Sequence, residues 1–408
     1  MKTYDFAIVG GGASGLFAAL RAAERGLSVL LLEAADRVGK KLLSTGNGQG
    51  NITCDAPLSP SRYHGGNPAF CAPALEAFDN SRAREVFREW GLLTLAEDSR
   101  VFPLSKQAGS IVDILRLSLA AAKVEIRTDF AVRRVEKKQV FELESENGKV
   151  EYAKSVLVAT GGKSSPTSKH FEAGYEIARA FGHRVTPLFP SLVQLRADMS
   201  GARVLKGIRA DVRLTLSDER TTYFSENGEI LFCDYGISGK IVFAGSSYVS
   251  GHSFSGLYAH IDFLPGFSEG ELVLLLAERT KKFPHLSPEQ LLLGVAKSQV
   301  ARAVLARAEL PHADSVSKLA PAELARVAAL CKDFPLRLTG LHSFDTAQVT
   351  HGGIRTDEVD SRTMMSKKCP GLYFSGEILD IDGDCGGFNL QWCWSSAEAA
   401  AKSAAERA

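Results

Sequence analysis

The pattern of apolar and polar positions begins with two short strands and a helix between them. Residues 4–9 and 28–32 are nearly continuous apolar runs, which is typical of strands buried on both faces of a parallel sheet. Apolar residues recur at helical spacing from Leu16 to Ala23, and Gly26 follows as a helix-ending residue. The first 33 residues therefore predict a strand–helix–strand unit with parallel strands.

A β-meander and a further buried strand are expected later in the chain. The β-prone runs 140–144 and 149–153 flank Asn147-Gly148, and Asn-Gly between two such runs is a strong hairpin signal. Residues 155–159 then form a buried apolar run that ends in glycines. This region predicts an addition to the same sheet.

The pattern changes after Pro190. Apolar residues alternate with polar ones over 212–216, and a second pair, Asn227-Gly228, is expected to join residues 221–226 to 229–232 in a hairpin. The alternation predicts an antiparallel β-domain that extends to about residue 265.

Residues 268–333 carry three helix-start signals. Ser268 with Glu271 is a capping box, Ser287-Pro288-Glu289-Gln290 combines an N-cap, a first-turn proline and an N3 partner, and Pro321 opens a third helix. From about residue 346 the chain returns to glycine-rich loops, a strand at 372–375 and an alanine-rich final helix.

These regions predict an α/β fold in which one domain is discontinuous. We expect a Rossmann-like domain interrupted by an inserted antiparallel β-domain and a helical segment. The expected boundaries are 1–187 for the first part of the Rossmann-like domain, 188–265 for the β-domain, 266–335 for the helical segment, 336–345 for the return to the β-domain, and 346–408 for the C-terminal part of the Rossmann-like domain.

Composition narrows the classes of partner. The chain has 408 residues with 48 Lys and Arg against 47 Asp and Glu, so a formal net charge of +1 gives no global attraction to nucleic acid or membrane. No segment approaches the roughly 18 apolar residues of a membrane span, and the N-terminus is too short and acidic for a signal peptide. We expect a cytoplasmic protein with no membrane partner. Seven scattered cysteines without metal spacing predict free thiols and no metal site.

The candidate chemistry starts at the first glycine turn. Gly10-x-Gly12-x-x-Gly15 lies between a predicted strand and helix, and Glu33 ends the next strand. This context predicts a dinucleotide site in which the turn and the helix N-terminus bind the pyrophosphate and Glu33 accepts hydrogen bonds from the ribose.

Three later segments favour FAD over NAD as the dinucleotide. They are two small-residue loops, each after a predicted strand, and a loop that opens the last helix. An extended FAD needs contacts from both parts of a discontinuous domain, and a helix N-terminus near the flavin would stabilise the negative charge of its reduced form. The expected contacts are Ala159, Thr160, Gly161, Gly162, Gly376, Glu377, Asp380, Gly387, Phe388, Asn389 and Leu390.

Over nearly its whole length the chain resembles the BaiN-like (YhiN-type) flavoproteins, a family that includes enzymes called aminoacetone oxidases. The segments that carry the resemblance are GGGASG (10–15), GKKLLSTGNGQGNIT (39–53), VFPLSKQA (101–108), LFCDYGISG (231–239), THGGI (350–354), TMMSKKCPGLYFSGEILDIDG (363–383) and GGFNLQWCWSSAEAA (386–400). The resemblance implies that the Rossmann-like domain is a discontinuous FAD-binding domain, and that the insert is an antiparallel β-barrel-like domain with a helical subdomain. It implies an FAD-dependent oxidoreductase.

The resemblance adds further cofactor contacts. It implies that the loop after Lys40 and Lys41 approaches the flavin ring and that the backbone at Val132 touches the adenine. With the glycine turn, the added contacts are Ala13, Ser14, Ala34, Lys40, Lys41, Thr45, Gly46, Asn47, Gly48, Asn51 and Val132. The chain departs from the family pattern at Gln49-Gly50, Cys54, Cys233-Asp234 and Lys240, which implies a substrate different from that of better-known members.

No catalytic residue follows from the sequence, because the flavin itself performs the redox step. His351 is a candidate proton donor or a structural histidine, and Asp234 and Tyr235 are candidate substrate contacts or turn residues. Cys385 and Cys393 lack the spacing of a dithiol pair.

Three enzymatic functions and one non-enzymatic function stay open at this point. The first is NAD(P)H-driven reduction of an unsaturated small molecule, with NAD(P)H as a transient donor since no second glycine fingerprint follows residue 15. The second is oxidation of a small amine with formation of hydrogen peroxide. The third is reduction of a base in structured RNA, for which basic residues in 196–213 and 281–307 form a modest excess. The last is a flavin-bound interaction protein.

Overall fold

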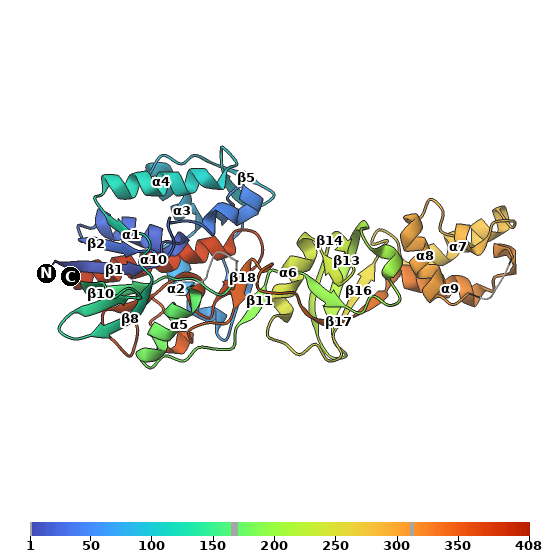
Figure 1. Ribbon diagram of the computed structural model, residues 1–408. Helices are drawn as coiled ribbons and strands as arrows, with labels where there is room; N and C mark the ends of the chain where they lie inside the picture. Colours follow the sequence, from blue (N-terminus) through green and yellow to red (C-terminus); the bar gives the residue numbers. More distant parts are fainter. Residues whose placement is uncertain (1, 165–169, 311–313) are drawn as a thin grey trace. The chain divides into compact units, whose positions relative to one another are not determined.

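The computed structural model describes residues 2–164, 170–310 and 314–408. It divides into two compact units: unit 1 comprises Met1–Ser191 and Ala347–Ala408, and unit 2 comprises Leu192–Thr346. In Figure 1 the blue-to-green first segment and the red last segment of the chain form one body, which is unit 1.

A seven-stranded sheet organises unit 1. Its parallel core has the order β7-β2-β1-β10, and β19 pairs in parallel with the second half of β10. The first half of β10 pairs instead with β9 in an antiparallel hairpin, and β8 follows β9. The strands of this sheet are β1 (Thr3–Val9), β2 (Val29–Leu32), β7 (Glu125–Arg127), β8 (Val132–Lys137), β9 (Phe141–Ser145), β10 (Val150–Val158) and β19 (Leu372–Phe374).

Helices and short sheets complete unit 1. The helices are α1 (Ala13–Glu24), α2 (Ala72–Ala77), α3 (Asn80–Glu89), α4 (Ala108–Ala121), α5 (Phe171–Ala180) and α10 (Phe388–Arg407), with the 3-10 turns η1 (Leu42–Gly48) and η8 (Gly376–Ile378). The remaining strands pair as β3 (Thr53–Cys54) and β5 (Thr94–Glu97) with β6 (Arg100–Pro103), β4 (Tyr63–His64) with β20 (Asp382–Gly383), and β11 (Phe189–Ser191) with β18 (Val349–His351).

The last helix holds the core of unit 1 together. Helices α1 and α10 pack side by side (Figure 1), and the rings of Phe17 and Trp394 lie 5.3 Å apart between them. The Trp394 indole N–H donates to the backbone oxygen of Ile52 at 2.7 Å. The C-terminal segment is therefore part of the same core as the N-terminal strand–helix–strand unit.

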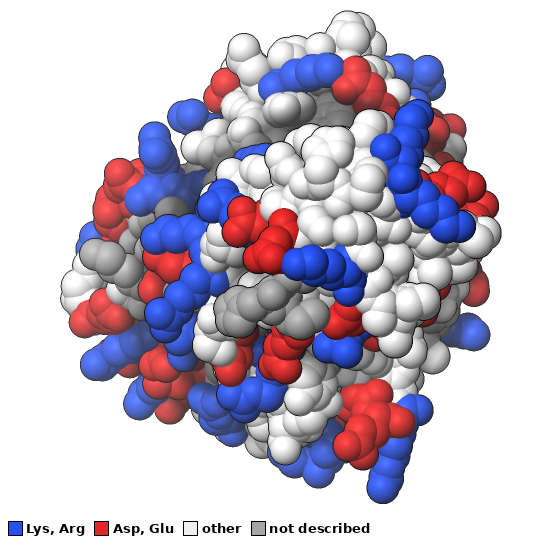
Figure 2. All heavy atoms as spheres, turned by 90° about the vertical axis from the view of Figure 1, so that its right-hand side faces the viewer, with Lys and Arg blue, Asp and Glu red and all other residues white. Residues whose placement is uncertain are grey.

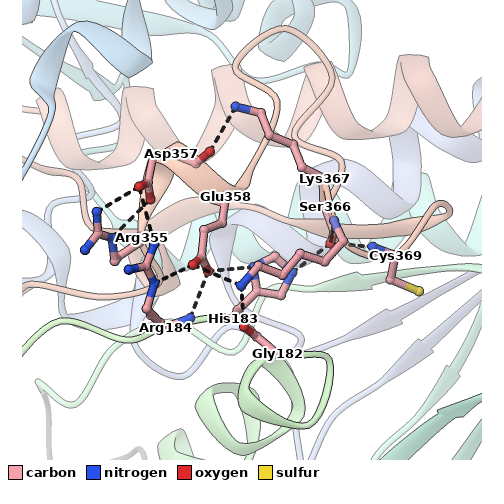
Figure 3. Close-up of polar contacts among 10 residues, drawn as sticks. Gly182, His183, Arg184, Arg355, Asp357, Glu358, Ser366, Lys367 and Cys369 are labelled. Carbon is pink, nitrogen blue, oxygen red and sulfur yellow. Dashed lines mark hydrogen bonds and ion pairs between the residues drawn. The ribbon is translucent and has the colours of Figure 1, made fainter.

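A buried polar network fixes the segment 355–369 to the end of α5 (Figure 3). The carboxylate of Glu358, only 6% exposed, accepts hydrogen bonds from the backbone N–H of Arg184 at 2.8 Å and from its Nε at 2.7 Å, and Lys368 Nζ lies 3.0 Å away. Burial alone would raise the pKa of Glu358, but the bonds from Arg184 and Lys368 outweigh it and lower the pKa from 4.5 to about 2. Burial lowers the pKa of the neighbouring His183, which favours its neutral form.

Unit 2 is a closed antiparallel barrel with helices attached. The strand order around the barrel is β12-β15-β14-β13-β16-β17. The strands are β12 (Leu195–Ala197), β13 (Arg209–Ser217), β14 (Thr222–Phe232), β15 (Gly236–Ser238), β16 (Tyr258–Asp262) and β17 (Phe334–Leu341), and the helices are α6 (Lys240–Val249), α7 (Glu269–Lys282), α8 (Ser298–Arg307) and α9 (Pro321–Lys332). The predicted fold class, a discontinuous Rossmann-like domain with an inserted barrel and helical subdomain, is confirmed.

The hairpin predicted at Asn227-Gly228 is wrong, because β14 runs straight through both residues. The turn lies earlier, where the Asp218 carboxylate accepts the backbone N–H groups of Arg220 and Thr221 at 2.8 and 2.7 Å. A Cβ on Gly228 would lie 3.0 Å from the Cβ of Ile241, so this glycine permits close packing of α6 on the strand.

The helix predicted to start after Ser287 is also wrong. Its capping box forms, but it caps only the 3-10 turn η5 (Pro288–Gln290), and α8 begins later, at Ser298. Gly294 between them has a φ of +75°, a conformation that interrupts an α-helix. None of the helices in the described ranges has the length and apolar character that a membrane crossing needs.

The Glu358 network generates a stability prediction. We expect Glu358→Gln to lower the free energy of unfolding at pH 7 by about 1.5–3 kcal/mol, because it removes charge-assisted hydrogen bonds from a buried acceptor. Since the folded-state pKa is depressed, this contribution is complete above the usual pKa of 4.5 and is lost as the pH falls towards about 2. Urea unfolding of the wild-type and Glu358→Gln proteins, at pH values from 7 down to about 2, measures the difference.

Asp357→Asn is the matched control, because Asp357 belongs to the same network but its side chain is 52% exposed. Its exposed ion pairs contribute at most about 1 kcal/mol. Equal effects of the two substitutions, or a Glu358 effect that persists at pH 2, would contradict the assignment.

Candidate functional site

The glycine turn after β1 is shaped by contacts within the protein at two of its glycines. Gly10 has a φ of +107°, and a Cβ there would lie 2.5 Å from the backbone oxygen of Ala159. A Cβ on Gly15 would lie 1.9 Å from the backbone oxygen of Gly10. Side chains are therefore excluded at both positions, which brings the turn against the loop that follows β10.

Gly12 differs from these two glycines. It is the N-cap of α1, it has an ordinary φ of −81°, and no side chain caps the helix there. A Cβ on Gly12 would meet no atom of the described residues within 4 Å. The turn is thus open at Gly12, and the first N–H groups of α1 are available to an anionic group such as a pyrophosphate.

Glu33 lies at the end of β2 and faces this turn. Its Oε2 accepts the backbone N–H of Gly11 at 2.7 Å, and its Oε1 accepts that of Ala35 at 2.8 Å. Each carboxylate oxygen has a second lone pair, so both oxygens can accept another hydrogen bond, as a ribose would supply. The backbone oxygen of Glu33 accepts the N–H of Phe130, which places Val132 and the start of β8 near this end of the sheet.

The two segments of unit 1 meet at the first turn of α1. Ser14 and Ser375 hydrogen-bond through their hydroxyls, and Ser375 also bonds to Ser396 of α10 at 2.9 Å. The backbone N–H of Gly376 donates to the Ser396 hydroxyl at 3.0 Å. A Cβ on Gly376 would lie 3.1 Å from the Cβ of Ser14. The structure therefore brings together predicted contacts that are more than 350 residues apart.

Glu377 joins three loops through its side chain. Its carboxylate accepts hydrogen bonds from Lys41 Nζ at 2.5 Å, from the Ser164 hydroxyl at 2.7 Å and from the backbone N–H of Thr350 at 2.8 Å. With three donors already bound, the carboxylate positions the loops around the candidate site. Direct contact between Glu377 or Lys41 and a cofactor stays a prediction.

Asp380 and the start of α10 form another edge of the candidate site. Burial raises the pKa of Asp380, and its Oδ2 accepts the backbone N–H of Gly66 at 3.2 Å. Asn389 bonds to both backbone groups of Gly383, at 2.8 and 2.6 Å. Gly387, with a φ of +106°, packs against the backbone of Thr53 and is the N-cap of α10 without a side-chain cap. A second helix N-terminus thus lies in this group of loops.

Phe388 and Leu390 follow in the first turn of α10, and both side chains pack in the core of unit 1.

Thr160 carries a buried hydroxyl without a partner in the described part of the chain. It follows Ala159 in the loop that touches Gly10, and Gly161 beside it has a φ of +74°. Next in the loop, a Cβ on Gly162 would lie 2.5 Å from the Thr350 hydroxyl. A buried polar atom without a partner is expected to bind a ligand or an ordered water. The hydroxyl lies against α5, where a Cβ on Gly174 would be 2.0 Å from it. The open turn at Gly12 and the free lone pairs of Glu33 are therefore the features that fit a bound dinucleotide.

The predicted ring-facing loop has a constrained backbone. Gly46, Asn47 and Gly48 have φ values of +57°, +55° and +84° and are exposed. The Thr45 hydroxyl donates to the backbone oxygen of Leu42, and Asn51 Oδ1 accepts the N–H of Val101 at 3.2 Å, so both side chains stabilise the loop itself. Lys40 forms an ion pair with Asp36 at 2.5 Å.

The remaining candidate residues lie in both units and differ in exposure. Asp234, in unit 2, is exposed and forms an ion pair with Lys206 at 2.9 Å, and Tyr235 lies beside the ring of His342. Neither Cys385 nor Cys393 forms a disulfide in the described part of the chain. His351, on β18, bonds through Nδ1 to the buried Asp382 at 2.8 Å.

Sequence reasoning missed the residues that connect the loops, namely Ser164, Ser375, Asp382 and Ser396. Serine and aspartate in glycine-rich loops are ordinary turn residues, so their types carried no signal. The alternating acids of Asp380, Asp382 and Asp384 are the one pattern that could have indicated a clustered polar edge.

Comparison with known proteins gives full-length similarities. The family described as HI0933-like protein Rossmann domain matches residues 4–403. The 3-dehydro-bile acid delta(4,6)-reductase of Clostridium scindens is 33% identical over 404 residues, which cover 98% of each chain. The ribosomal RNA dihydrouridine synthase of Escherichia coli is 31% identical over 405 residues, again 98% of each chain, and that of Haemophilus influenzae is 28% identical over 405 residues, 97% of each chain.

The open turn at Gly12 generates a prediction about cofactor binding. We expect Gly12→Ala to leave the free energy of unfolding of the apoprotein unchanged or raised by up to about 1 kcal/mol, because a Cβ fits there and alanine restricts the unfolded chain. FAD affinity should fall about tenfold or more, since the Cβ occupies the space a pyrophosphate needs, and tenfold corresponds to about 1.4 kcal/mol. Urea unfolding, and FAD content after dialysis and heat release, measure the two effects.

Gly15→Ala is the control for a glycine required by the fold, and it should destabilise the apoprotein itself because of the clash with Gly10. Unchanged FAD retention in a folded Gly12→Ala protein would show that the pyrophosphate does not approach this turn.

Proposed function

The chain belongs to the HI0933-like family of Rossmann-fold, FAD-dependent oxidoreductases, and from that premise we propose that it uses electrons from NAD(P)H to reduce a conjugated carbon–carbon double bond in a small molecule. The observation that carries the proposal is the 33% identity, over 98% of both chains, to a reductase of that kind.

The names of the two relatives describe one type of reaction. A 3-dehydro bile acid has a ketone next to its Δ4 double bond, and uridine has a carbonyl next to the double bond that dihydrouridine lacks. Both names therefore describe saturation of a double bond conjugated to a carbonyl. We infer the same class of reaction for this chain and assign the bond to a small molecule.

The residues of unit 1 would hold FAD across both segments of the chain. The turn at Gly12 and the first turn of α1 would bind the pyrophosphate, and Glu33 would accept from the adenosine ribose. The backbone of the loop 159–162, Asp380 and the N-terminus of α10 would contact the flavin half of the molecule. When bound, the flavin supplies the hydride equivalent for the reaction.

The donor would bind transiently. A single glycine fingerprint, at 10–15, is present in the sequence, so the chain has one site of this kind for a tightly held dinucleotide. NAD(P)H would therefore dock and leave before the substrate binds, which corresponds to ping-pong kinetics.

Reduction of a uridine in RNA is the second candidate, favoured by the 31% identity to the Escherichia coli enzyme. Figure 2 shows basic and acidic side chains interspersed over the face that carries α7–α9. RNA-binding surfaces typically concentrate basic residues on one face, so this arrangement favours the small molecule.

Anaerobic stopped-flow spectroscopy of the purified protein tests the proposal. We expect NADH or NADPH to bleach the flavin absorption band and a 3-dehydro-Δ4,6 bile acid to restore it. Uridine-containing ribosomal RNA should restore it far more slowly.

Two other outcomes would change the assignment. Bleaching by aminoacetone but not by NAD(P)H, with hydrogen peroxide formed in air, would establish the amine oxidase instead. Rapid restoration by RNA but not by the bile acid would establish the RNA-modifying function.

A further inference from the structure

His351 and Asp382 form a hydrogen-bonded pair in unit 1. The His351 ring bonds through Nδ1 to Asp382 Oδ1 at 2.8 Å, and the Ser191 hydroxyl donates to Asp382 Oδ2 at 2.9 Å. The Asp382 side chain is 0% exposed, whereas that of His351 is 19% exposed. In the described part of the chain, Nε2 of His351 has no hydrogen-bond partner, so the outer nitrogen of the ring is accessible.

Within the described ranges, His351 is the one counterion in contact with the Asp382 carboxylate. Among the described residues, no Lys or Arg forms an ion pair with it, and His351 is the one basic side chain in contact. The neighbouring pair of His64 with Asp384 differs, because Arg62 also binds that carboxylate, at 2.9 Å. A buried carboxylate is stabilised by a compensating charge, and among the described side chains a protonated His351 is the one in contact that can supply it to Asp382.

The pair lies among the predicted cofactor loops. Thr350, next to His351 on β18, donates its backbone N–H to Glu377, and its hydroxyl accepts the N–H of Ser164. Asp382 lies two residues after Asp380, and Gly383 bonds to Asn389 of α10. The same loops that fit FAD thus position the imidazole.

We propose that His351, oriented by Asp382, donates the proton that completes reduction of the substrate. This inference rests on the proposed function. Saturating a conjugated double bond requires a hydride equivalent at one carbon and a proton at its neighbour. The π bond breaks and two C–H bonds form. One receives the hydride equivalent that bound reduced FAD would supply, which leaves the FAD oxidised, and the other receives the proton as the Nε2–H bond of the imidazolium breaks. Neutral His351 then regains its proton from water, and the electrons come from NAD(P)H.

The electrostatic setting supports a charged imidazole. Burial alone would lower the pKa of His351, but the hydrogen bond to Asp382 and the nearby charges of Asp382 and Asp380 outweigh it, so the pKa is raised above 6.5. The donor form therefore dominates below this raised pKa and is lost as the pH rises through it. Asp382 is a positioning residue in this account, and His351 is the catalytic one.

Single-turnover measurement separates this step from the rest of the cycle. The holoprotein is reduced anaerobically with dithionite and mixed with a 3-dehydro-Δ4,6 bile acid, and reoxidation of the flavin is followed. We expect His351→Gln to slow reoxidation by about 10²–10⁴-fold, while FAD content and the rate of bleaching by NAD(P)H stay near wild type. In wild type the reoxidation rate should fall as the pH rises through the pKa of His351. In Asp382→Asn the midpoint of this fall should lie about 1–3 pH units lower.

A second readout does not depend on activity. NMR titration of the imidazole signals in the oxidised holoprotein, assigned with the His351 variant, should place the pKa of His351 above 6.5 in wild type and lower it in Asp382→Asn. His260→Gln is the matched control, because His260 bonds through the same nitrogen to Asp333 at 2.7 Å, but the Asp333 side chain is 60% exposed and in unit 2. It should leave reoxidation unchanged.

The outcomes distinguish the two claims. Failure of wild type to reoxidise with the bile acid overturns the proposed substrate class. Reoxidation of wild type at the same rate as His351→Gln overturns the role of His351. A pKa of His351 at or below 6.5 in wild type also overturns that role. Because this titration uses the wild-type protein, it tests the role even when His351→Gln does not retain FAD.

Discussion

The pairing of β19 with β10 is the contact on which the rest of unit 1 depends. Val156, Leu157 and Val158 pair in parallel with Leu372, Tyr373 and Phe374, and all six residues are fully buried. This ladder places η8 and α10 at the same end of the sheet as the glycine turn after β1. Without it, the two groups of loops that fit FAD would not lie at the same end of the sheet.

The insertion of unit 2 leaves this arrangement intact. The chain leaves unit 1 at β11 and returns at β18, and these two strands pair with each other, from Phe189 with His351 to Ser191 with Val349. An insertion whose ends are neighbours in one small sheet does not separate the elements on either side of it. The same return strand carries Thr350 and His351, so the junction itself contributes to the candidate site.

Local signals made the fold class and the glycine turn predictable from the sequence. The Asn147-Gly148 hairpin formed as expected, because its turn chemistry and the apolar alternation of its strands agree. Asn227-Gly228 has the same local signal, yet packing of Ile241 against Gly228 and the cap at Asp218 determine the outcome. The contacts from Ser14 to Ser375 and from Lys41 to Glu377 join residues more than 300 positions apart, and a single sequence contains no signal for such pairs.

We propose that one FAD molecule is held by both segments of unit 1 at once. Hydrogen–deuterium exchange of the apoprotein with and without FAD tests it directly. We expect FAD to slow amide exchange together at residues 10–15, 159–162 and 376–390. Protection confined to residues 10–35, or protection found in the barrel of unit 2 instead, would contradict it.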